Sequence, residues 1–205
     1  MTRKIAFYGG SFDPVHRGHL AVGVAVLAQF GLDDFVFVPA FHAPHKSRKR
    51  PTSAYDRYAM LCLVTRDEPA MRVSRIEIEA PERPYSVETL SRLKDQLPDD
   101  RIFFVMGADS WEEITTWRDW ETVLSLTDHI IVTRPGYDIG STHLTDTVRS
   151  RVVDVRGHEA VEVTDEGSRI YITDAVNVDV SATEVRHKIA NGEPSWRDDV
   201  PGEVA

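Results

Sequence analysis

Short apolar runs alternate with longer amphipathic stretches along most of the chain. The apolar runs are continuous rather than interleaved with polar residues, which is typical of strands buried on both faces of a sheet. The longer stretches repeat apolar residues at the spacing of an α-helix. This pattern predicts a single α/β domain over residues 1–205, a Rossmann-like, doubly wound parallel sheet with helices on both faces. The expected strands are 5–8, 35–38, 71–74, 76–78, 102–106, 130–132, 161–164 and 169–173. The expected helices are 19–30, 52 or 53 to 64, 86–97, 110–126 in one piece or two, and 181–191.

The stretch GGSFDPVHRGHL, residues 9–20, joins the first expected strand to the first expected helix. A glycine-rich turn between a strand and a helix directs backbone N–H groups and the helix N-terminus toward one point, which favours an anion. His16 and His19 are three residues apart, so both imidazoles lie on one side of the helix start. A phosphate there would meet N–H dipoles and two imidazole donors together, and we therefore predict a nucleoside triphosphate site. The other residues expected at this site are Gly9, Gly10, Ser11, Phe12 and Gly18.

The histidine pair has two other interpretations. A zinc site would need a third ligand, and none is evident near His16 and His19, so no metal site is predicted. The second interpretation is structural, with one histidine capping the helix and the other exposed to solvent. The complete stretch of residues 9–20 favours the phosphate site over both.

Composition narrows the function classes. The chain is 28% charged and 41% hydrophobic, as is typical of a soluble globular protein. Its formal net charge of −9 argues against an extended nucleic-acid-binding surface. No stretch suits a membrane span, and the apolar stretch after Arg3 and Lys4 is too short for a signal peptide. The single cysteine, Cys62, cannot form an internal disulfide. We therefore expect a cytoplasmic protein with neither nucleic-acid nor membrane partners, and a homo-oligomer is left open.

A second candidate phosphate site lies at the start of the last expected helix. Ser181 with Glu184 three residues later is the pattern of a capping box. The hydroxyls of Ser181 and Thr183, the free N–H groups of the helix end and the guanidinium of Arg186 would together hold a phosphate. The alternative is a well-capped helix with Arg186 on the surface.

Two further segments place candidate ligands after expected strands. Lys46 follows the second strand and could bring a positive charge to the triphosphate. Gly107 and Asp109 follow the strand at 102–106, where Asp109 either caps the next helix or accepts hydrogen bonds from a ribose. Trp117 either packs in the core or stacks on an electron-poor ring. Because ligands bind at the carboxyl ends of parallel strands, we expect the strand-end residues to converge with the histidines.

These motifs resemble a known superfamily. GGSFDPVHRGHL is similar to the signature of the adenylyl- and cytidylyltransferases, whose HxGH motif is shared with class I aminoacyl-tRNA synthetases. VSATEVR at 180–186 is similar to the ISSTxxR signature of the same superfamily, except that Ala182 removes one hydroxyl. The resemblance implies that this second motif binds the triphosphate.

The segments between the two motifs resemble one family, the bacterial nicotinate-nucleotide adenylyltransferases. The resemblance covers residues 4–192, although members of that family continue beyond Pro201 into a closing helix that contains tyrosine and histidine. It implies that Trp117 stacks on the nicotinate ring. The segments that carry it are PHK at 44–46, YSVETL at 85–90, GADS at 107–110, TW at 116–117 and TRPG at 133–136.

The resemblance also implies a reaction. The 5′-phosphate of nicotinate mononucleotide would attack the α-phosphorus of ATP directly, with Mg²⁺ bound mainly through the ATP phosphates, to give nicotinic acid adenine dinucleotide and pyrophosphate. A phosphopantetheine adenylyltransferase-like enzyme and a non-catalytic nucleotide-binding regulator are the alternatives. The implied catalytic residues are His16, His19, Lys46 and Arg186. The residues expected to bind the mononucleotide are His45, Tyr85, Ser86, Trp117 and Arg134.

Overall fold

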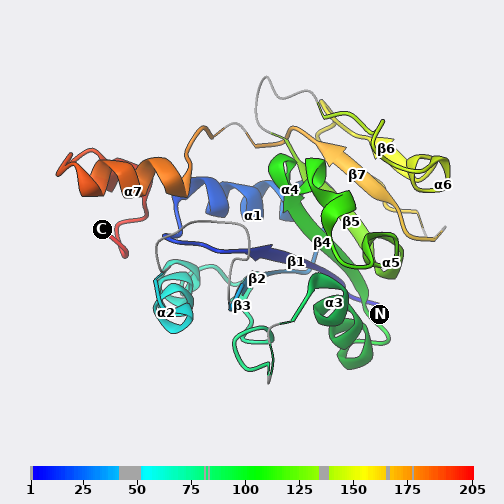
Figure 1. Ribbon diagram of the computed structural model, residues 1–205, viewed down its shortest axis with the longest axis horizontal. Helices are drawn as coiled ribbons and strands as arrows, with labels where there is room; N and C mark the ends of the chain where they lie inside the picture. The colour runs from blue at the N-terminus through cyan, green and yellow to red at the C-terminus, as the bar shows by residue number, and fades with distance from the viewer. Residues whose placement is uncertain are drawn as a thin grey trace.

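One sheet of seven parallel strands runs through the part of the chain that the computed structural model describes, residues 2–41, 52–80, 82, 84–133, 139–164, 167–176 and 178–205 (Figure 1). The strands lie in the order β3-β2-β1-β4-β5-β7-β6, and every neighbouring pair is parallel. This confirms the predicted parallel sheet. The strands are β1 (Lys4–Gly10), β2 (Asp34–Pro39), β3 (Met71–Val73), β4 (Arg101–Gly107), β5 (Asp128–Val132), β6 (Val152–Asp154) and β7 (Ile170–Thr173).

Helices cover both faces of the sheet, as predicted. β1 alternates between the two faces: Ala6 packs in the cluster that contains α1 and α2, whereas Ile5 and Phe7 pack in the cluster that contains α3, α4, α5 and α6. β2 and β5 are buried along their whole length, because both of their faces are covered. The helical segments are α1 (Arg17–Phe30), α2 (Ala54–Thr65), α3 (Ser86–Gln96), α4 (Ala108–Glu112), the 3₁₀ helix η1 (Ile114–Thr116), α5 (Trp120–Leu126), α6 (Asp146–Arg149), α7 (Ala182–Ala190) and α8 (Trp196–Asp199).

The strand order reverses between β1 and β4. From β1 the chain moves outward through β2 to β3, and it then returns to β4 on the other side of β1. Ligands of open α/β sheets bind at such a switch point, beyond the carboxyl ends of the strands. In Figure 1, α7 lies at the opposite end of the molecule from the N-terminus.

Two expected strands are absent, and one expected helical stretch is in three pieces. Residues 76–78 form a turn rather than a strand, closed by the Glu79 N–H, which donates to the Arg75 carbonyl at 2.9 Å. Residues 161–164 are not a strand, because the Val161 N–H donates to the Gln29 carbonyl on α1 at 2.8 Å instead of to a neighbouring strand. The helix expected at 110–126 is divided into α4, η1 and α5, and Asp119 just before α5 has a left-handed backbone with φ of +50°.

Gln29 joins α1 to the far side of the sheet. Its side chain is buried in the last turn of α1 and accepts a hydrogen bond from the Thr173 hydroxyl at 2.7 Å. Its Nε2 donates to the His158 carbonyl at 2.7 Å. Thr173 ends β7 and is fully buried, so this amide connects the first helix to the last strand along the chain.

We expect Gln29→Leu to lower the free energy of unfolding by about 1–3 kcal/mol, because the buried Thr173 hydroxyl then lacks its acceptor. Urea denaturation of the two proteins measures the difference. In the double variant Gln29→Leu/Thr173→Val, the loss should be smaller than the sum of the two single losses. Fully additive losses would show that the two side chains do not depend on each other.

Candidate active site

A pocket opens at the switch point, between the end of β1 and the end of β4. It brings together five of the residues predicted from the sequence, namely His16, Gly18, His19, Gly107 and Asp109. Two stretches far apart in the chain therefore face one another there, as the strand-end argument expected. The complete lining of this switch-point pocket is Tyr8, His16, Gly18, His19, Val22, Gly107, Ala108, Asp109, Val132, Thr133, Val176, Val178 and Val180.

The β1–α1 loop, residues 11–16, is anchored by the ring of Phe12. This residue has a left-handed backbone with φ of +48°, which is uncommon for a residue with a side chain. Its ring is only 1% exposed and packs edge-on against Tyr8 and Phe37, with centroids 5.5 Å apart in both pairs. A Cβ on Gly10 would lie 2.9 Å from the Phe12 ring, so glycine is required there. Core packing therefore holds this turn in place.

The glycines do not form the turn that the sequence predicted. Gly9 and Gly10 are the last residues of β1 and lie opposite Val38 and Pro39 of β2. The strand continues through them because both are held in the sheet by parallel pairing. The change of direction occurs at Phe12, two residues later.

The two histidines are stacked at the start of α1. Their ring centroids lie 3.6 Å apart, and the angle between the ring planes is 23°. His16 is the N-cap residue, as the structural interpretation allowed, and its backbone N–H donates to Nδ1 of His19 at 3.1 Å. Because Nδ1 accepts this bond, a neutral His19 ring carries its proton on Nε2. The rings of Phe12 and His19 pack edge to face, with a centroid distance of 4.9 Å. His19 is therefore oriented as a donor through Nε2.

The start of α7 is tied to the β1–α1 loop. Ser181 is the N-cap, and its hydroxyl accepts from the Glu184 N–H at 3.2 Å, which confirms the predicted cap. Arg186 is exposed, yet its Nη1 donates to the Asp13 carbonyl at 2.5 Å and its Nη2 donates to the Thr183 hydroxyl at 3.1 Å. The two predicted phosphate motifs are thus joined by a direct hydrogen bond.

Asp109 is not a helix cap. The N-cap of α4 is Gly107, and Asp109 lies in the first turn of that helix, where it lines the switch-point pocket. The capping alternative for Asp109 is therefore wrong. Its contact with a ribose remains a prediction.

The segments expected to bind the mononucleotide lie beside each other. Tyr85 is the N-cap of α3, directly before Ser86, and 51% of its surface is exposed. The guanidinium of Arg118 lies 4.8 Å from the centroid of the Tyr85 ring. Trp117, which precedes Arg118, is half-buried against the core cluster that includes α3 and α5. Trp117 therefore has a packing role, and stacking on a ligand remains a prediction.

Three predicted site residues, His45, Lys46 and Arg134, lie outside the described residues. Their roles stay predictions.

Sequence reasoning missed a buried arginine next to the site. Arg57 of α2 is only 1% exposed, and its Nη1 donates to the Ser11 carbonyl at 2.5 Å. The helical spacing contained a signal, because Ala54, Leu61 and Val64 form the buried stripe of α2 and Arg57 lies on that stripe.

Glu77 is a second missed residue. Its Oε1 accepts from the Thr89 hydroxyl at 3.1 Å, and the Phe41 N–H also donates to this carboxyl. Burial raises the pKa of Glu77 to about 7, although these two donors and the charge of Arg57 act in the opposite direction. The carboxyl thus connects the end of β2 to α3.

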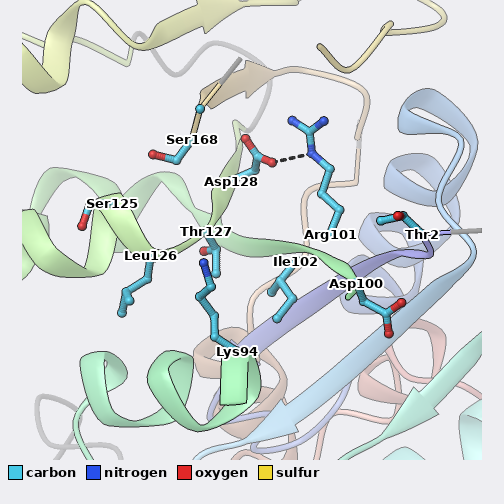
Figure 2. A pocket seen from close by; sticks show the side chains of 11 residues that line it. Thr2, Lys94, Asp100, Arg101, Ile102, Ser125, Leu126, Thr127, Asp128 and Ser168 are labelled. Atoms are coloured by element: carbon cyan, nitrogen blue, oxygen red, sulfur yellow. Dashed lines mark hydrogen bonds and ion pairs between the residues drawn. The ribbon is translucent and has the colours of Figure 1, made fainter. Parts of the chain in front are cut away.

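A larger cavity, of about 420 Å³, lies at the opposite edge of the sheet, where β4 and β5 begin (Figure 2). Its buried charges are already paired, since Arg101 Nε donates to Asp128 Oδ2 at 2.8 Å. Lys94 of α3 also lines this cavity. Because ligands of parallel α/β sheets bind at the carboxyl ends of the strands, we assign the candidate site to the switch-point pocket.

Within the residues that the structure describes, no group of three or more His, Cys, Asp or Glu side chains could hold a metal ion. In that same part of the chain, no helix is long and apolar enough to cross a membrane.

Comparison with known proteins identifies the family of this chain. The family model for cytidylyltransferase-like proteins matches residues 7–188. The chain therefore belongs to the cytidylyltransferase-like family, the class that the parallel sheet and the histidine motif indicated.

The relatives narrow this class to the nicotinate-nucleotide adenylyltransferases. A protein of Streptomyces coelicolor with the name "Probable nicotinate-nucleotide adenylyltransferase" is 39% identical over 188 residues, which is 92% of this chain and 89% of the relative. A protein of Corynebacterium jeikeium with the same name is 33% identical, with the same coverage. The nicotinic acid mononucleotide adenylyltransferase of Plasmodium falciparum, solved with NaAD, has the same fold, with a TM-score of 0.67, 17% identity and coverage of 96% of this chain and 93% of the other.

We expect Glu77→Gln to change how stability depends on pH. When folding raises the pKa of a carboxyl, the protein loses stability as pH rises from the pKa of that carboxyl in the unfolded state to its pKa in the folded state. For Glu77 this interval runs from 4.5 to about 7. The stability of the Gln variant relative to the wild type should therefore increase across this interval and be constant above it. Urea denaturation at a series of pH values measures this, and a difference that does not depend on pH would contradict the buried-carboxyl explanation.

Proposed function

We propose that this chain transfers the adenylyl group of ATP to nicotinate mononucleotide and releases pyrophosphate, a step of NAD synthesis. The observation that carries the proposal is the stacked pair His16 and His19, which lines one pocket with Gly107 and Asp109 at the switch point. The family and the names of the relatives support the same reaction.

The proposed reaction is a single displacement at phosphorus. An oxygen of the acceptor 5′-phosphate forms a bond to the α-phosphorus of ATP. The bond from that phosphorus to the oxygen that bridges to the β-phosphate breaks, and its electron pair leaves with pyrophosphate. No protein nucleophile is required, since such transfers depend on positioning and on stabilisation of charge.

The described residues support specific roles in this displacement. His19 would donate from Nε2 to the triphosphate as negative charge moves onto the leaving group, because its Nδ1 is occupied by the His16 N–H. Arg186 would exchange its bond to the Asp13 carbonyl for a bidentate contact with phosphate oxygens. Lys46, which lies outside the described residues, would add a second positive charge to that of Arg186. Mg²⁺ would enter as part of the MgATP substrate, on phosphate oxygens.

The acceptor would lie beside the start of α3. The exposed ring of Tyr85, the hydroxyl of Ser86 and the indole of Trp117 come from two segments that Arg118 brings together. An electron-poor pyridine ring would stack on the indole.

The direct test is a pyrophosphate-release assay with a panel of acceptors. Nicotinate mononucleotide should be used with a higher kcat/KM than nicotinamide mononucleotide or phosphopantetheine. Preference for phosphopantetheine would indicate the related coenzyme A enzyme instead. ATP binding without turnover of any acceptor would indicate a nucleotide-binding regulator.

Two variants separate the orienting and donating roles of His19. In His19→Asn, the amide oxygen can still accept from the His16 N–H, but the donor at the Nε2 position is absent. We expect kcat to fall about 100-fold or more while the melting temperature stays near that of the wild type. His19→Gln, which places an amide donor near the Nε2 position, should recover part of the activity. Activity of His19→Asn within a few-fold of the wild type would contradict the assignment.

Trp117→Ala should raise KM for the mononucleotide by about 5- to 200-fold, as expected for loss of one aromatic stack, and leave KM for ATP nearly unchanged. Trp120→Ala is the matched control, because Trp120 is half-buried against the same core cluster. Both variants should lower the melting temperature, whereas only Trp117→Ala should change KM. Equal effects of the two variants on both KM values would mean that Trp117 only packs in the core.

A further inference from the structure

Arg57 collects backbone carbonyls from three separate segments around the end of the sheet. Its Nη1 donates to the Ser11 carbonyl at 2.5 Å, its Nη2 to the Ala40 carbonyl at 2.6 Å and its Nε to the Thr52 carbonyl at 3.1 Å. A longer contact of 3.4 Å joins Nη2 to the Phe41 carbonyl. The guanidinium therefore holds the β1–α1 loop, the end of β2 and the residues before α2 together.

No other side chain could make this set of bonds. The guanidinium presents five N–H donors in one plane, whereas lysine presents three donors on a single nitrogen. The carbonyls of Ser11, Ala40 and Thr52 come from three segments and bond three different nitrogen atoms of the guanidinium, whereas an ammonium group offers one nitrogen and an amide only two N–H donors. A carbonyl that loses its donor in this partly buried network is costly.

The guanidinium also places a positive charge beside the β1–α1 loop. In the described part of the chain, carbonyl oxygens rather than a directly bonded carboxylate surround the guanidinium. Asp13 and Glu77 act on it only at longer range, and burial lowers the pKa of Arg57 from its ordinary value. The positive charge of Arg57 lies beside the loop that precedes His16, because the guanidinium is bonded to the Ser11 carbonyl of that loop.

The network continues toward the acceptor side. The Phe41 N–H donates to the Glu77 carboxyl, which also accepts from the Thr89 hydroxyl of α3 at 3.1 Å. Tyr85 is the N-cap of that same helix. The loop after β1 and the helix proposed to hold the mononucleotide are therefore linked through Arg57, Phe41 and Glu77.

We infer that Arg57 is a positioning residue for adenylyl transfer. Its bond to the Ser11 carbonyl holds the β1–α1 loop, and with it the histidine pair, in the position that ATP binding requires. This inference rests on the proposed function and deepens it. It assigns no direct contact between Arg57 and substrate.

The test compares Arg57→Lys with Arg151→Lys. Arg151 is the matched control, because it is a half-buried arginine whose Nη1 donates to the Leu124 carbonyl at 2.9 Å and to the Ser168 hydroxyl at 2.5 Å, beside the cavity at the other edge of the sheet. Both variants lose part of a guanidinium network and should lower the melting temperature. Only Arg57→Lys should lower kcat/KM for ATP, by about 10- to 100-fold, since a displacement of one ångström is enough for such a loss.

Two further readouts separate positioning from loss of stability. KM for the mononucleotide should stay within about twofold in Arg57→Lys, because Tyr85 and Trp117 are unchanged and the bond from Thr89 of α3 to Glu77 does not involve Arg57. Binding of a non-hydrolysable ATP analogue, measured by calorimetry, should weaken in Arg57→Lys and remain at the wild-type level in Arg151→Lys. Equal kcat/KM and equal analogue binding in the two variants would overturn the inference.

The remaining outcomes are also decisive. If Arg57→Lys does not fold, Arg57→Gln replaces it, because its amide can still bond two of the carbonyls. If neither folds while Arg151→Lys does, Arg57 is a purely structural residue and the inference fails. If the wild type releases no pyrophosphate with any acceptor, the proposed function fails instead, and analogue binding alone still tests whether Arg57 positions the loop.

Discussion

The central position of β1, with β2 on one side and β4 on the other, determines where chemistry can take place in this fold. The helices that follow β1 and β4 pack on opposite faces of the sheet. The N-termini of these two helices therefore lie apart at the carboxyl ends of the strands, and the pocket opens between them. Both helix ends direct N–H groups toward this pocket, so it favours a negatively charged ligand before any side chain is considered.

Two arginines from distant helices then hold the loop that enters this pocket. Arg57 of α2 bonds the Ser11 carbonyl, and Arg186 of α7 bonds the Asp13 carbonyl two residues later. Carbonyl partners neutralise a cation less than a carboxylate would, so both guanidinium groups still contribute positive potential where a triphosphate would bind. The two arginines differ in exposure. Arg57 is inaccessible and suited to hold the loop, whereas Arg186 is exposed and suited to exchange its carbonyl partner for a ligand.

Local sequence was sufficient for the features that depend on short spacings. His16 and His19 lie on one side of a helix start because they are three residues apart, and Ser181 caps α7 through a bond to a residue three positions later. The failures share a different cause. Trp117 was expected within a helical stretch, but the chain is extended there and turns left-handed at Asp119 before α5 begins. Residues 161–164 have the composition of a strand, yet their backbone bonds to α1.

The sequence by itself determined the class of fold, the order of most elements and the place of the histidine motif at the start of the first helix, because continuous apolar runs and short spacings are local properties of the chain. Only the tertiary structure decided which residues hold that motif in place. The turn at Phe12 is made by packing against Tyr8 and Phe37, and the loop is fixed by Arg57 from a helix 46 residues further along the chain. Such contacts join segments that are distant in sequence, and backbone carbonyls, their main partners, are the same in every residue.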